Sequence, residues 1–361
     1  MCSLTLQHVS RVKESDLLQH VSPNTIRLLV KKLRFLALKC RLSRLQLTQI
    51  LTVISAGTSS LEELCLLHTL PTLCFNGRKR SARDLSSLLI SESLSKIESV
   101  TLPLCTCLFF GSKHGFLLRY LLETIQKTKS VPLKNLNLGA TDLRPYCASL
   151  LSQSLMKLEY VDFYRSKISA EQLKCLFETL SAMGEKNSLS LKKVKFGGLI
   201  DLEDKLEEIP SKTIVEGLTS LVSLDLPNTL KPETIKLFLT NLANSSRPTL
   251  QEVNFGLTDL SSVPASLLVN SVLKLVSVSI GTERLFLEHP RITVNTEQVT
   301  LLLKTIVKSS VYKLQLKHLK VVCWEDQSIC SDKLIINAES KLEGLRVFTF
   351  CPVISEAAHE A

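Results

Sequence analysis

Apolar residues recur along the chain in one short phrase. It consists of an aliphatic residue, two variable residues, an aliphatic residue, one variable residue and a further apolar residue. The last two apolar positions alternate with variable ones, and this two-residue period predicts a β-strand whose apolar side chains share one face. The phrase occurs eleven times, at steps of 25 to 36 residues. Its copies start at Leu33, Leu61, Ile97, Leu133, Leu158, Leu191, Leu221, Leu250, Leu275, Val311 and Leu345.

The stretches between the phrases have a helical period instead. Residues 170–182, 231–242 and 296–306 each place apolar residues three and four positions apart. In the first of them Leu173, Leu176 and Phe177 share one stripe with Leu180. Because helical connections join parallel strands, neighbouring strands are predicted to be parallel. Strand and helix recurring at this spacing are typical of a solenoid.

Longer copies show that the middle of the chain arose by duplication. Residues 133–143 (LKNLNLGATDL) align with 250–260 (LQEVNFGLTDL) at an offset of 117, and residues 148–163 align with 265–280 at the same offset. The register breaks at 281–290, where an insertion precedes the next helical stretch. We therefore expect blocks of several repeats to be related in structure.

This pattern resembles the leucine-rich repeat family, and the long repeats resemble its ribonuclease-inhibitor-like branch. The resemblance implies an α/β horseshoe of about eleven repeats, with a parallel concave sheet and outer α-helices. The family has a small polar residue at the ninth position of each repeat, and six copies here keep one: Thr69, Cys105, Thr141, Ser166, Thr229 and Thr258. We expect an N-terminal cap over residues 1–32, a solenoid over 33–350 and a tail over 351–361. Residues 319–341 lose the helical period and are expected to form a long loop with a short strand or helix.

Composition limits the location of the protein. The chain has no run of 18 apolar residues, so no membrane span is expected, and residues 1–15 lack the pattern of a secretory signal. Eleven cysteines then predict reduced thiols and a cytoplasmic protein.

The net charge of +10 includes one loop cluster, whose members are Arg78, Lys79, Arg80 and Arg83. A solvated loop is the favoured interpretation of this cluster, and a nuclear-import signal or an anionic contact is the alternative.

Catalytic motifs are absent from the sequence. It contains no phosphate-binding glycine loop, no nucleophile elbow and no H-E-x-x-H. A zinc site is conceivable where adjacent loops stack; its ligands would come from Cys65, His68, Cys74, Cys105, Cys107 and His114. The C-x-C spacing is too short for an ordinary zinc knuckle, so no metal is expected. No enzyme activity, cofactor or small-molecule substrate is expected either, and without aromatic stacking platforms nucleic acid is not favoured.

The function that this pattern favours is a protein-binding scaffold. The alternative is a regulatory or ligand-sensing repeat fragment of the kind found in NOD-like receptors, which the resemblance brings with it. Binding energy concentrates in Tyr, Trp and Arg anchors, and one predicted strand carries two tyrosines on its outward face. The candidate partner site on the concave face comprises Asn135, Asn137, Tyr160, Asp162, Tyr164, Lys193 and Lys195. Solubility alone would also explain polar residues at these positions, and a partner on the loop at residues 78–83 or at the C-terminal edge stays open.

Overall fold

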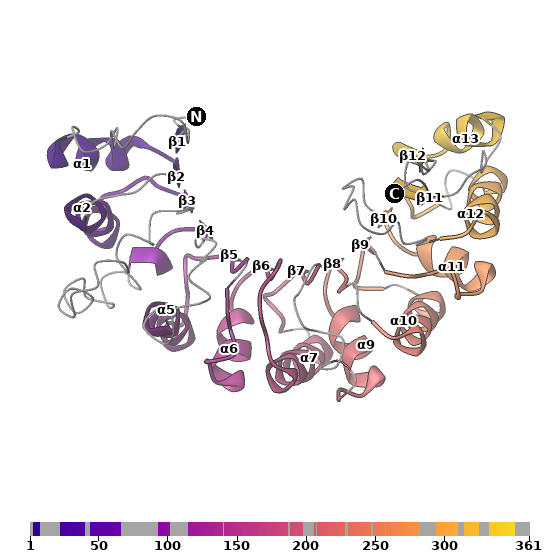
Figure 1. Ribbon diagram of the computed structural model, residues 1–361, viewed down its shortest axis with the longest axis horizontal. Helices are drawn as coiled ribbons and strands as arrows, with labels where there is room; N and C mark the ends of the chain where they lie inside the picture. The colour runs from indigo at the N-terminus through magenta and orange to yellow at the C-terminus, as the bar shows by residue number, and fades with distance from the viewer. Residues whose placement is uncertain are drawn as a thin grey trace, which may run out of the picture. The chain divides into compact units, whose positions relative to one another are not determined.

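The computed structural model describes residues 3–7, 22–39, 44–65, 93–101, 115–139, 141–186, 188–197, 206, 208–227, 230–246, 248–256, 258–281, 294–309, 314–324 and 332–350. The chain divides into two compact units. Unit 1 comprises Met1–Thr179, Lys186–Val194 and Leu199–Asp201, and unit 2 comprises Leu180–Glu185, Lys195–Gly198 and Leu202–Ala361. Each unit is an alternation of strands and helices (Figure 1). The basic cluster at residues 78–83, the phrase start Val311 and the tail 351–361 lie outside the described residues.

Unit 1 begins with the region predicted to be the N-terminal cap, which holds a strand and a helix. The elements in order are β1 (Ser3–Gln7), α1 (Pro23–Lys32), β2 (Phe35–Lys39), α2 (Arg44–Ser55), β3 (Glu63–Cys65), β4 (Ser99–Thr101), α5 (Gly115–Lys127), β5 (Asn135–Asn137), α6 (Ala148–Leu155), β6 (Tyr160–Asp162), α7 (Ala170–Glu185) and β7 (Lys193–Lys195). The boundary between the units falls within α7 and β7.

Unit 2 continues the same alternation. Its elements are α9 (Ser211–Thr219), β8 (Ser223–Asp225), α10 (Pro232–Asn244), β9 (Glu252–Asn254), α11 (Ala265–Val272), β10 (Ser277–Ile280), α12 (Thr296–Lys308), β11 (His318–Trp324), α13 (Asp332–Glu339) and β12 (Gly344–Phe350). Pro232 occupies the first turn of α10, where its missing N–H has no helical partner to lose.

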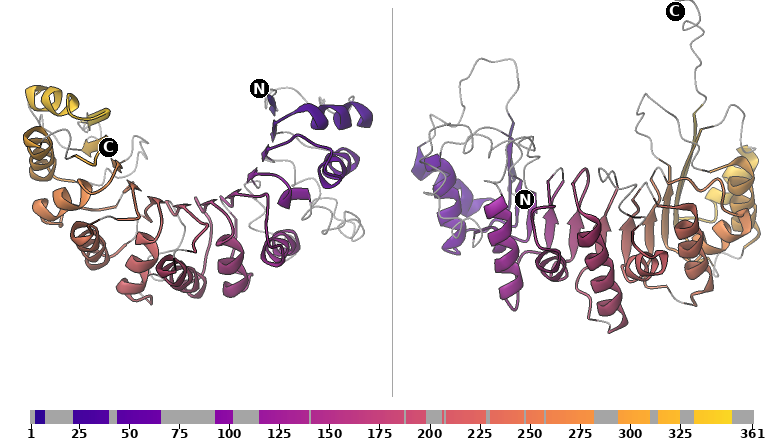
Figure 2. Two further views of the ribbon diagram at one scale, coloured as in Figure 1. Left: turned by 180° about the vertical axis from the view of Figure 1, so that it is seen from behind. Right: turned by 60° about the horizontal axis from the view of Figure 1, so that its bottom comes forward.

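Strands pair parallel and in chain order, from β1 to β6 in unit 1 and from β8 to β12 in unit 2, which confirms the predicted parallel arrangement. In both units the described helices lie on one side of the strands, and the other face of the sheet carries none of them (Figure 1, Figure 2). We call this the helix-free face. Its residues come from the third and fifth positions of each phrase.

Apolar positions of the phrase stack from strand to strand on the opposite, helix-covered face. The fourth positions are register partners: Leu36, Leu64, Val100, Leu136 and Val161 follow one another across β2 to β6, and each is at most 3% exposed. In unit 2 the fourth positions Leu224 and Val253 are each 2% exposed. The core therefore sits between strands and helices, as the two-residue period predicted.

Buried hydrogen bonds repeat at the duplicated positions. Ser154 donates through Oγ to the carbonyl of Leu122 at 2.8 Å, and Ser271 donates to the carbonyl of Leu239 at 2.7 Å. Both serines are fully buried, and each joins its helix to the preceding one. The duplicated sequence thus keeps its polar contacts as well as its apolar pattern, because an unsatisfied buried hydroxyl would cost stability.

The last two strands correct the predicted register. His318 pairs with Ser277 of β10, so the phrase that forms β11 begins at Leu316 rather than at Val311. Gly344 pairs with His318, so the final phrase begins at Leu342 rather than at Leu345. Residues 319–341, expected to be mainly loop, contribute most of β11 and all of α13.

The reason for the misplaced register is that two apolar patterns overlap here. Leu314 and Leu316 satisfy one frame, and Leu319 and Val321 satisfy the other. In the fold Leu319 and Val321 are 2% and 0% exposed and occupy the inward positions beside β10, whereas Leu314 is only half-buried.

Candidate partner-binding face

Six of the seven predicted site residues belong to unit 1. Asn135 is the register partner of Tyr160, and Asn137 is the register partner of Asp162, so these four residues form two rows across β5 and β6. Tyr164 follows β6 by two residues. Except for Asp162, which is 8% exposed, these side chains are half-buried. The predicted placement of Asn135 and Asn137 beside Tyr160 and Asp162 is therefore confirmed, whereas Tyr164, predicted to lie on the same strand as Tyr160, lies in the turn after that strand.

Asp162 organises the two tyrosines. Its Oδ2 accepts a hydrogen bond from the Tyr160 hydroxyl at 3.1 Å, and its Oδ1 accepts one from the backbone N–H of Tyr164 at 2.9 Å. A nearly buried carboxylate whose two oxygens both accept hydrogen bonds holds the donor groups in place, because losing either bond would leave a buried acceptor unsatisfied at a cost in free energy. Asp162 thus positions the side chain of Tyr160 and the backbone of Tyr164.

Asn137 has a structural role in the turn after β5. Its Oδ1 accepts a hydrogen bond from the backbone N–H of Gly139 at 2.8 Å, and the duplicated Asn254 accepts one from Gly256 at 3.1 Å. Asparagine is favoured in such turns because its side chain bonds to the backbone two residues later. A Cβ at Gly139 would lie 3.0 Å from Asn137 Oδ1 and 3.2 Å from the Tyr164 carbonyl oxygen, which explains the glycine.

Arg165 is a site residue that the phrase did not reveal. Its guanidinium lies 5.4 Å from the centre of the Tyr164 ring, within the range of a cation–π interaction. Its backbone is left-handed, with φ of 59°. Non-glycine residues rarely adopt this conformation, so the turn after β6 is held by its surroundings. Arg165 is exposed and adds a cation to the Tyr164 ring.

The two predicted lysines fall in different units. Lys193 belongs to unit 1, and its N–H donates to the carbonyl of Glu159 at 3.0 Å. Tyr160 donates in the same way to the carbonyl of Lys134, so the pattern that places Tyr160 beside Asn135 also places Lys193 beside Tyr160. Lys195 belongs to unit 2.

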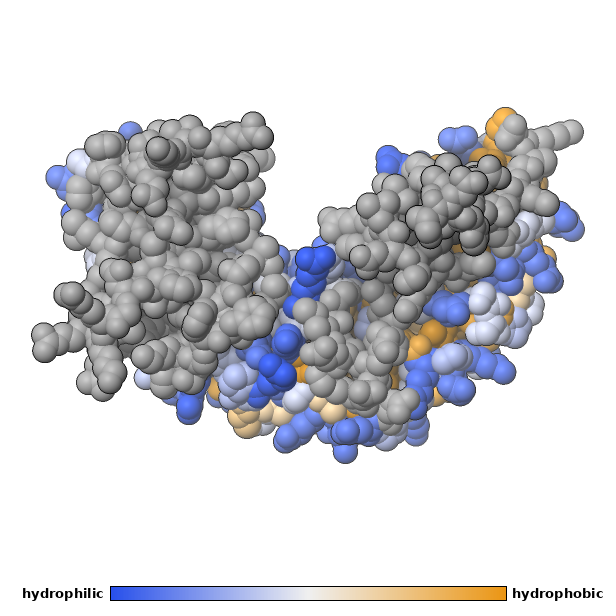
Figure 3. Space-filling model, viewed as in Figure 1, coloured by the Kyte–Doolittle hydropathy of each residue, from blue (hydrophilic) through white to orange (hydrophobic). Residues whose placement is uncertain are grey.

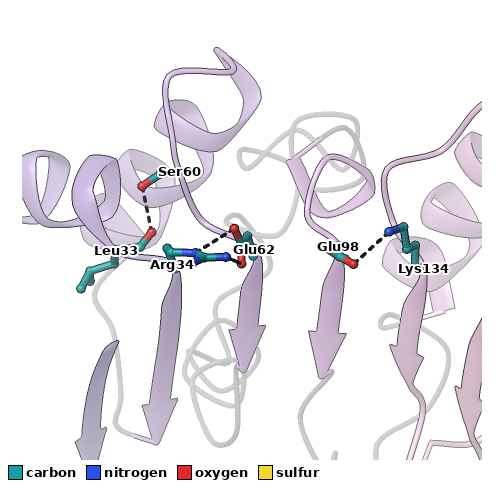
Figure 4. Close-up of polar contacts among 6 residues, drawn as sticks. All are labelled: Leu33, Arg34, Ser60, Glu62, Glu98 and Lys134. Atoms are coloured by element: carbon teal, nitrogen blue, oxygen red, sulfur yellow. Dashed lines mark hydrogen bonds and ion pairs between the residues drawn. The ribbon is translucent and has the colours of Figure 1, made fainter. Parts of the chain in front are cut away.

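Charged residues at the second phrase position form ion pairs between consecutive repeats. In unit 1 Arg34 pairs with Glu62 and Lys134 with Glu98, as Figure 4 shows. Lys192 pairs with Glu159 at 3.4 Å, and in unit 2 Lys317 pairs with Glu343 at 2.8 Å. The phrase treats this position as variable, although residues of opposite charge stand there in Arg34 and Glu62, in Glu98 and Lys134, and in Glu159 and Lys192.

These pairs shift the titration of their members. The hydrogen bond from Arg34 to Glu62 raises the pKa of the guanidinium, and the hydrogen bond from Lys134 to Glu98 raises the pKa of that ammonium. The hydrogen bond from Lys317 lowers the pKa of the Glu343 carboxyl. All of these shifted groups and their partners are exposed, so each pair contributes little to the stability of the fold.

Clusters of metal-ligating residues are absent from the part of the chain that the structure describes. No group of three or more His, Cys, Asp or Glu residues there is arranged to hold a metal ion. Of the conceivable zinc ligands, only Cys65 lies within the described residues, where it forms no disulfide bond; the same holds for Cys147 and Cys175. None of the helices described is long and apolar enough to cross a membrane.

The repeat geometry decides the class of fold. From β2 to β6 and from β8 to β11, consecutive phrases form strands in parallel register, with the fourth residue of each phrase buried, and the strands alternate with helices along the chain. The fold is a leucine-rich repeat. No protein-family model matches the chain, and no curated protein does. Among solved structures, the chain is similar to the leucine-rich repeat-containing protein LegL7 from Legionella pneumophila, at 13% identity and a TM-score of 0.44, over 84% of this chain and 87% of that one.

Proposed function

We propose that the chain is a protein-binding scaffold, and that a partner protein docks on the helix-free face of unit 1 at Tyr160, Tyr164 and Arg165. The observation that carries this proposal is the arrangement around Asp162. Asp162 holds the Tyr160 hydroxyl at 3.1 Å and the Tyr164 backbone N–H at 2.9 Å, so the Tyr160 ring and the turn that carries Tyr164 are ordered before a partner arrives. Ordered anchors bind more tightly because less conformational entropy is lost on binding.

The surrounding residues suit the rim of such an interface. Asn135 and Lys193 flank Tyr160 on the neighbouring strands, and both are half-buried. Tyrosine and arginine are the residue types that concentrate binding energy, and polar neighbours that exclude water support them. Asn137 and Asp162 contribute indirectly, through the backbone turns that they close.

The helix side of the repeats is the less favoured surface. Figure 3 shows an outer surface along the helices of unit 2 that is mainly hydrophilic, with hydrophobic residues exposed between. The large apolar residues exposed among the described helices are Leu28, Leu29, Tyr120, Leu237, Leu301 and Ile336, distributed over five helices. Scattered exposed apolar residues are ordinary for a soluble surface and do not mark a partner.

The test is a quantitative affinity capture from cells, comparing three forms of the full chain. Tyr160→Ala combined with Tyr164→Ala should weaken capture of the true partner by about 2 kcal/mol or more, since two anchors are removed. Tyr120→Ala is the matched control, because Tyr120 is 40% exposed on helix α5. A partner retained by the double variant and by the control alike would refute the proposed site. Unchanged circular dichroism of the double variant shows that its fold is intact.

A further inference from the structure

A row of side chains on the helix-free face of unit 2 changes charge steadily from strand to strand. The fifth positions of the phrase are register partners across five strands: Asp225 on β8, Asn254 on β9, Ser279 on β10, Lys320 on β11 and Arg346 on β12. The row runs from a carboxylate through an amide and a hydroxyl to an ammonium and a guanidinium. With strands about 4.8 Å apart, it spans about 19 Å.

The third positions beneath this row have the same polarity. They are Ser223, Glu252, Ser277, His318 and Gly344, again as successive register partners. The acidic member lies on β9 and the imidazole on β11, so both rows are acidic toward β8 and basic toward β12. Four residues of the upper row are half-buried and Arg346 is exposed.

The basic end of the row is hollowed. A cavity of about 450 Å³ is lined by residues of β10, β11 and β12, among them Ser279, Lys320 and Arg346. Gly344 contributes to the hollow because it has no side chain, and a Cβ there would lie 3.0 Å from His318 Nδ1. An extended peptide segment can therefore approach the strands at this end.

Two carboxylates also lie near the hollow and add negative charge close to the basic end of the row. Glu339 and Glu343 line it from the α13 side. Lys317 Nζ holds Glu343 at 2.8 Å, and His318 Nε2 lies 3.6 Å from the same carboxylate. These acidic groups thus stand at the start of the strands, whereas Lys320 and Arg346 lie at the fifth position of their phrases.

We propose that this row binds an extended, charge-polarised segment of a partner protein that crosses the strands, with acidic residues over β11 and β12 and basic residues at β8. Seven extended residues reach about 23 Å, enough to cover the row. The surface lies in unit 2 and does not depend on the tyrosine site in unit 1. A uniform polyanion such as a nucleic acid fits less well, because Asp225 and Glu252 would repel one end of it.

The test measures binding of a labelled heptapeptide, Glu-Glu-Glu-Ser-Ser-Lys-Lys, to the full chain by fluorescence anisotropy at about 10 mM salt, where charges interact over about 30 Å. Its control has the same composition in mixed order, Glu-Lys-Ser-Glu-Lys-Ser-Glu. The ordered peptide should bind at least about fivefold more tightly, because only it places both charge blocks on their complements. Equal binding of the two peptides would overturn the proposal, and so would tighter binding of a seven-nucleotide single strand.

Substitutions in the row test whether its side chains are responsible for peptide binding. Lys320→Gln with Arg346→Gln should weaken the ordered peptide about tenfold or more, while Lys236→Gln with Lys304→Gln should change it less than about twofold. The second pair makes the same change in net charge at exposed positions on helices α10 and α12. Equal loss in both double variants would mean that net charge alone attracts the peptide, and the proposal would fail. Asp225→Asn provides an independent check, since it should reduce the preference for the ordered peptide over Glu-Glu-Glu-Ser-Ser-Ser-Ser.

Discussion

The guanidinium of Arg34 and the carboxylate of Glu62 meet through two hydrogen bonds, of 2.8 and 2.7 Å, between the second positions of consecutive repeats. Figure 4 shows the Glu98–Lys134 pair two repeats further along the same edge, with the signs reversed. Bidentate pairing of this kind adds geometric specificity to attraction. The complementary second positions thus add a charge attraction between these particular neighbouring repeats.

A charge exchange tests the role of this pair. Glu62→Arg should lower the thermal midpoint slightly, and more at low salt, because two guanidiniums then face each other across β2 and β3. Arg34→Glu added to Glu62→Arg should restore the midpoint, since the pair is rebuilt with its signs reversed. The measurement is thermal unfolding followed by circular dichroism at two salt concentrations. Additive losses in the double variant would show that the pair does not act as a unit.

Gln298 offers a sharper test of the buried polar contacts. Its Nε2 donates to the carbonyls of Leu260 and Val263, each at 2.7 Å, and its side chain is 1% exposed. Gln172 makes the corresponding bonds to Leu143 and Tyr146 in unit 1. Gln298→Glu replaces the donor by an acceptor against two carbonyl oxygens, so it should cost about 1–3 kcal/mol of unfolding free energy at neutral pH.

The sign of the pH dependence follows from burial. The new carboxyl has a raised pKa in the folded state, so its protonated form is favoured there. The deficit relative to the parent should be small below the unfolded pKa of about 4.3 and should grow as the pH rises through the folded pKa. Urea unfolding at pH 4 and pH 7 measures this difference. Gln172→Glu should behave alike, and a deficit that is independent of pH in both variants would contradict the hydrogen-bond assignment.

The register of β11 can be tested by two truncations. Leu319 is 2% exposed and lies at the fourth position of its phrase, so Leu319→Ala should lower the unfolding free energy by about 2–5 kcal/mol. Leu314 is half-buried before the strand, and Leu314→Ala should cost less than half as much. Urea unfolding measures both losses. The reverse order would favour the frame that begins at Val311.

Cys147 should be the more reactive of the thiols near α6 and α7. The hydrogen bond with the Ser149 hydroxyl, 3.1 Å away, and the backbone N–H groups at the start of α6 lower its pKa. More thiolate is then present at pH 7 to 8, and the thiolate is the nucleophile. Iodoacetamide labelling of the folded chain, followed by peptide mass spectrometry, should modify Cys147 before the half-buried Cys175. Ser149→Ala should slow the labelling of Cys147, and an unchanged rate would exclude the hydroxyl as the cause.

Much of the candidate site was readable from the phrase, and part of it was not. The placement of Asn135 beside Tyr160 follows from equal positions in consecutive copies, and the structure confirms it. The role of Asp162 does not follow, since its acceptors are used by a hydroxyl and a backbone N–H whose directions depend on the turn. Arg165 was missed because its approach to Tyr164 requires a left-handed residue that no periodicity encodes. Partner binding itself stays a prediction.

For the phrases that start at Leu33 to Leu275, the sequence by itself determined where strands form, which of their residues are buried, and that neighbouring strands run parallel. It could do so because these properties depend on the spacing of apolar residues a few positions apart. The tertiary structure decided the register of β11, where two apolar frames overlap and only packing against β10 selects Leu319 and Val321. It also decided which polar residues serve the fold, since Gln298 reaches carbonyls 35 and 38 residues away. Contacts across that separation depend on how repeats stack, which local patterning leaves open.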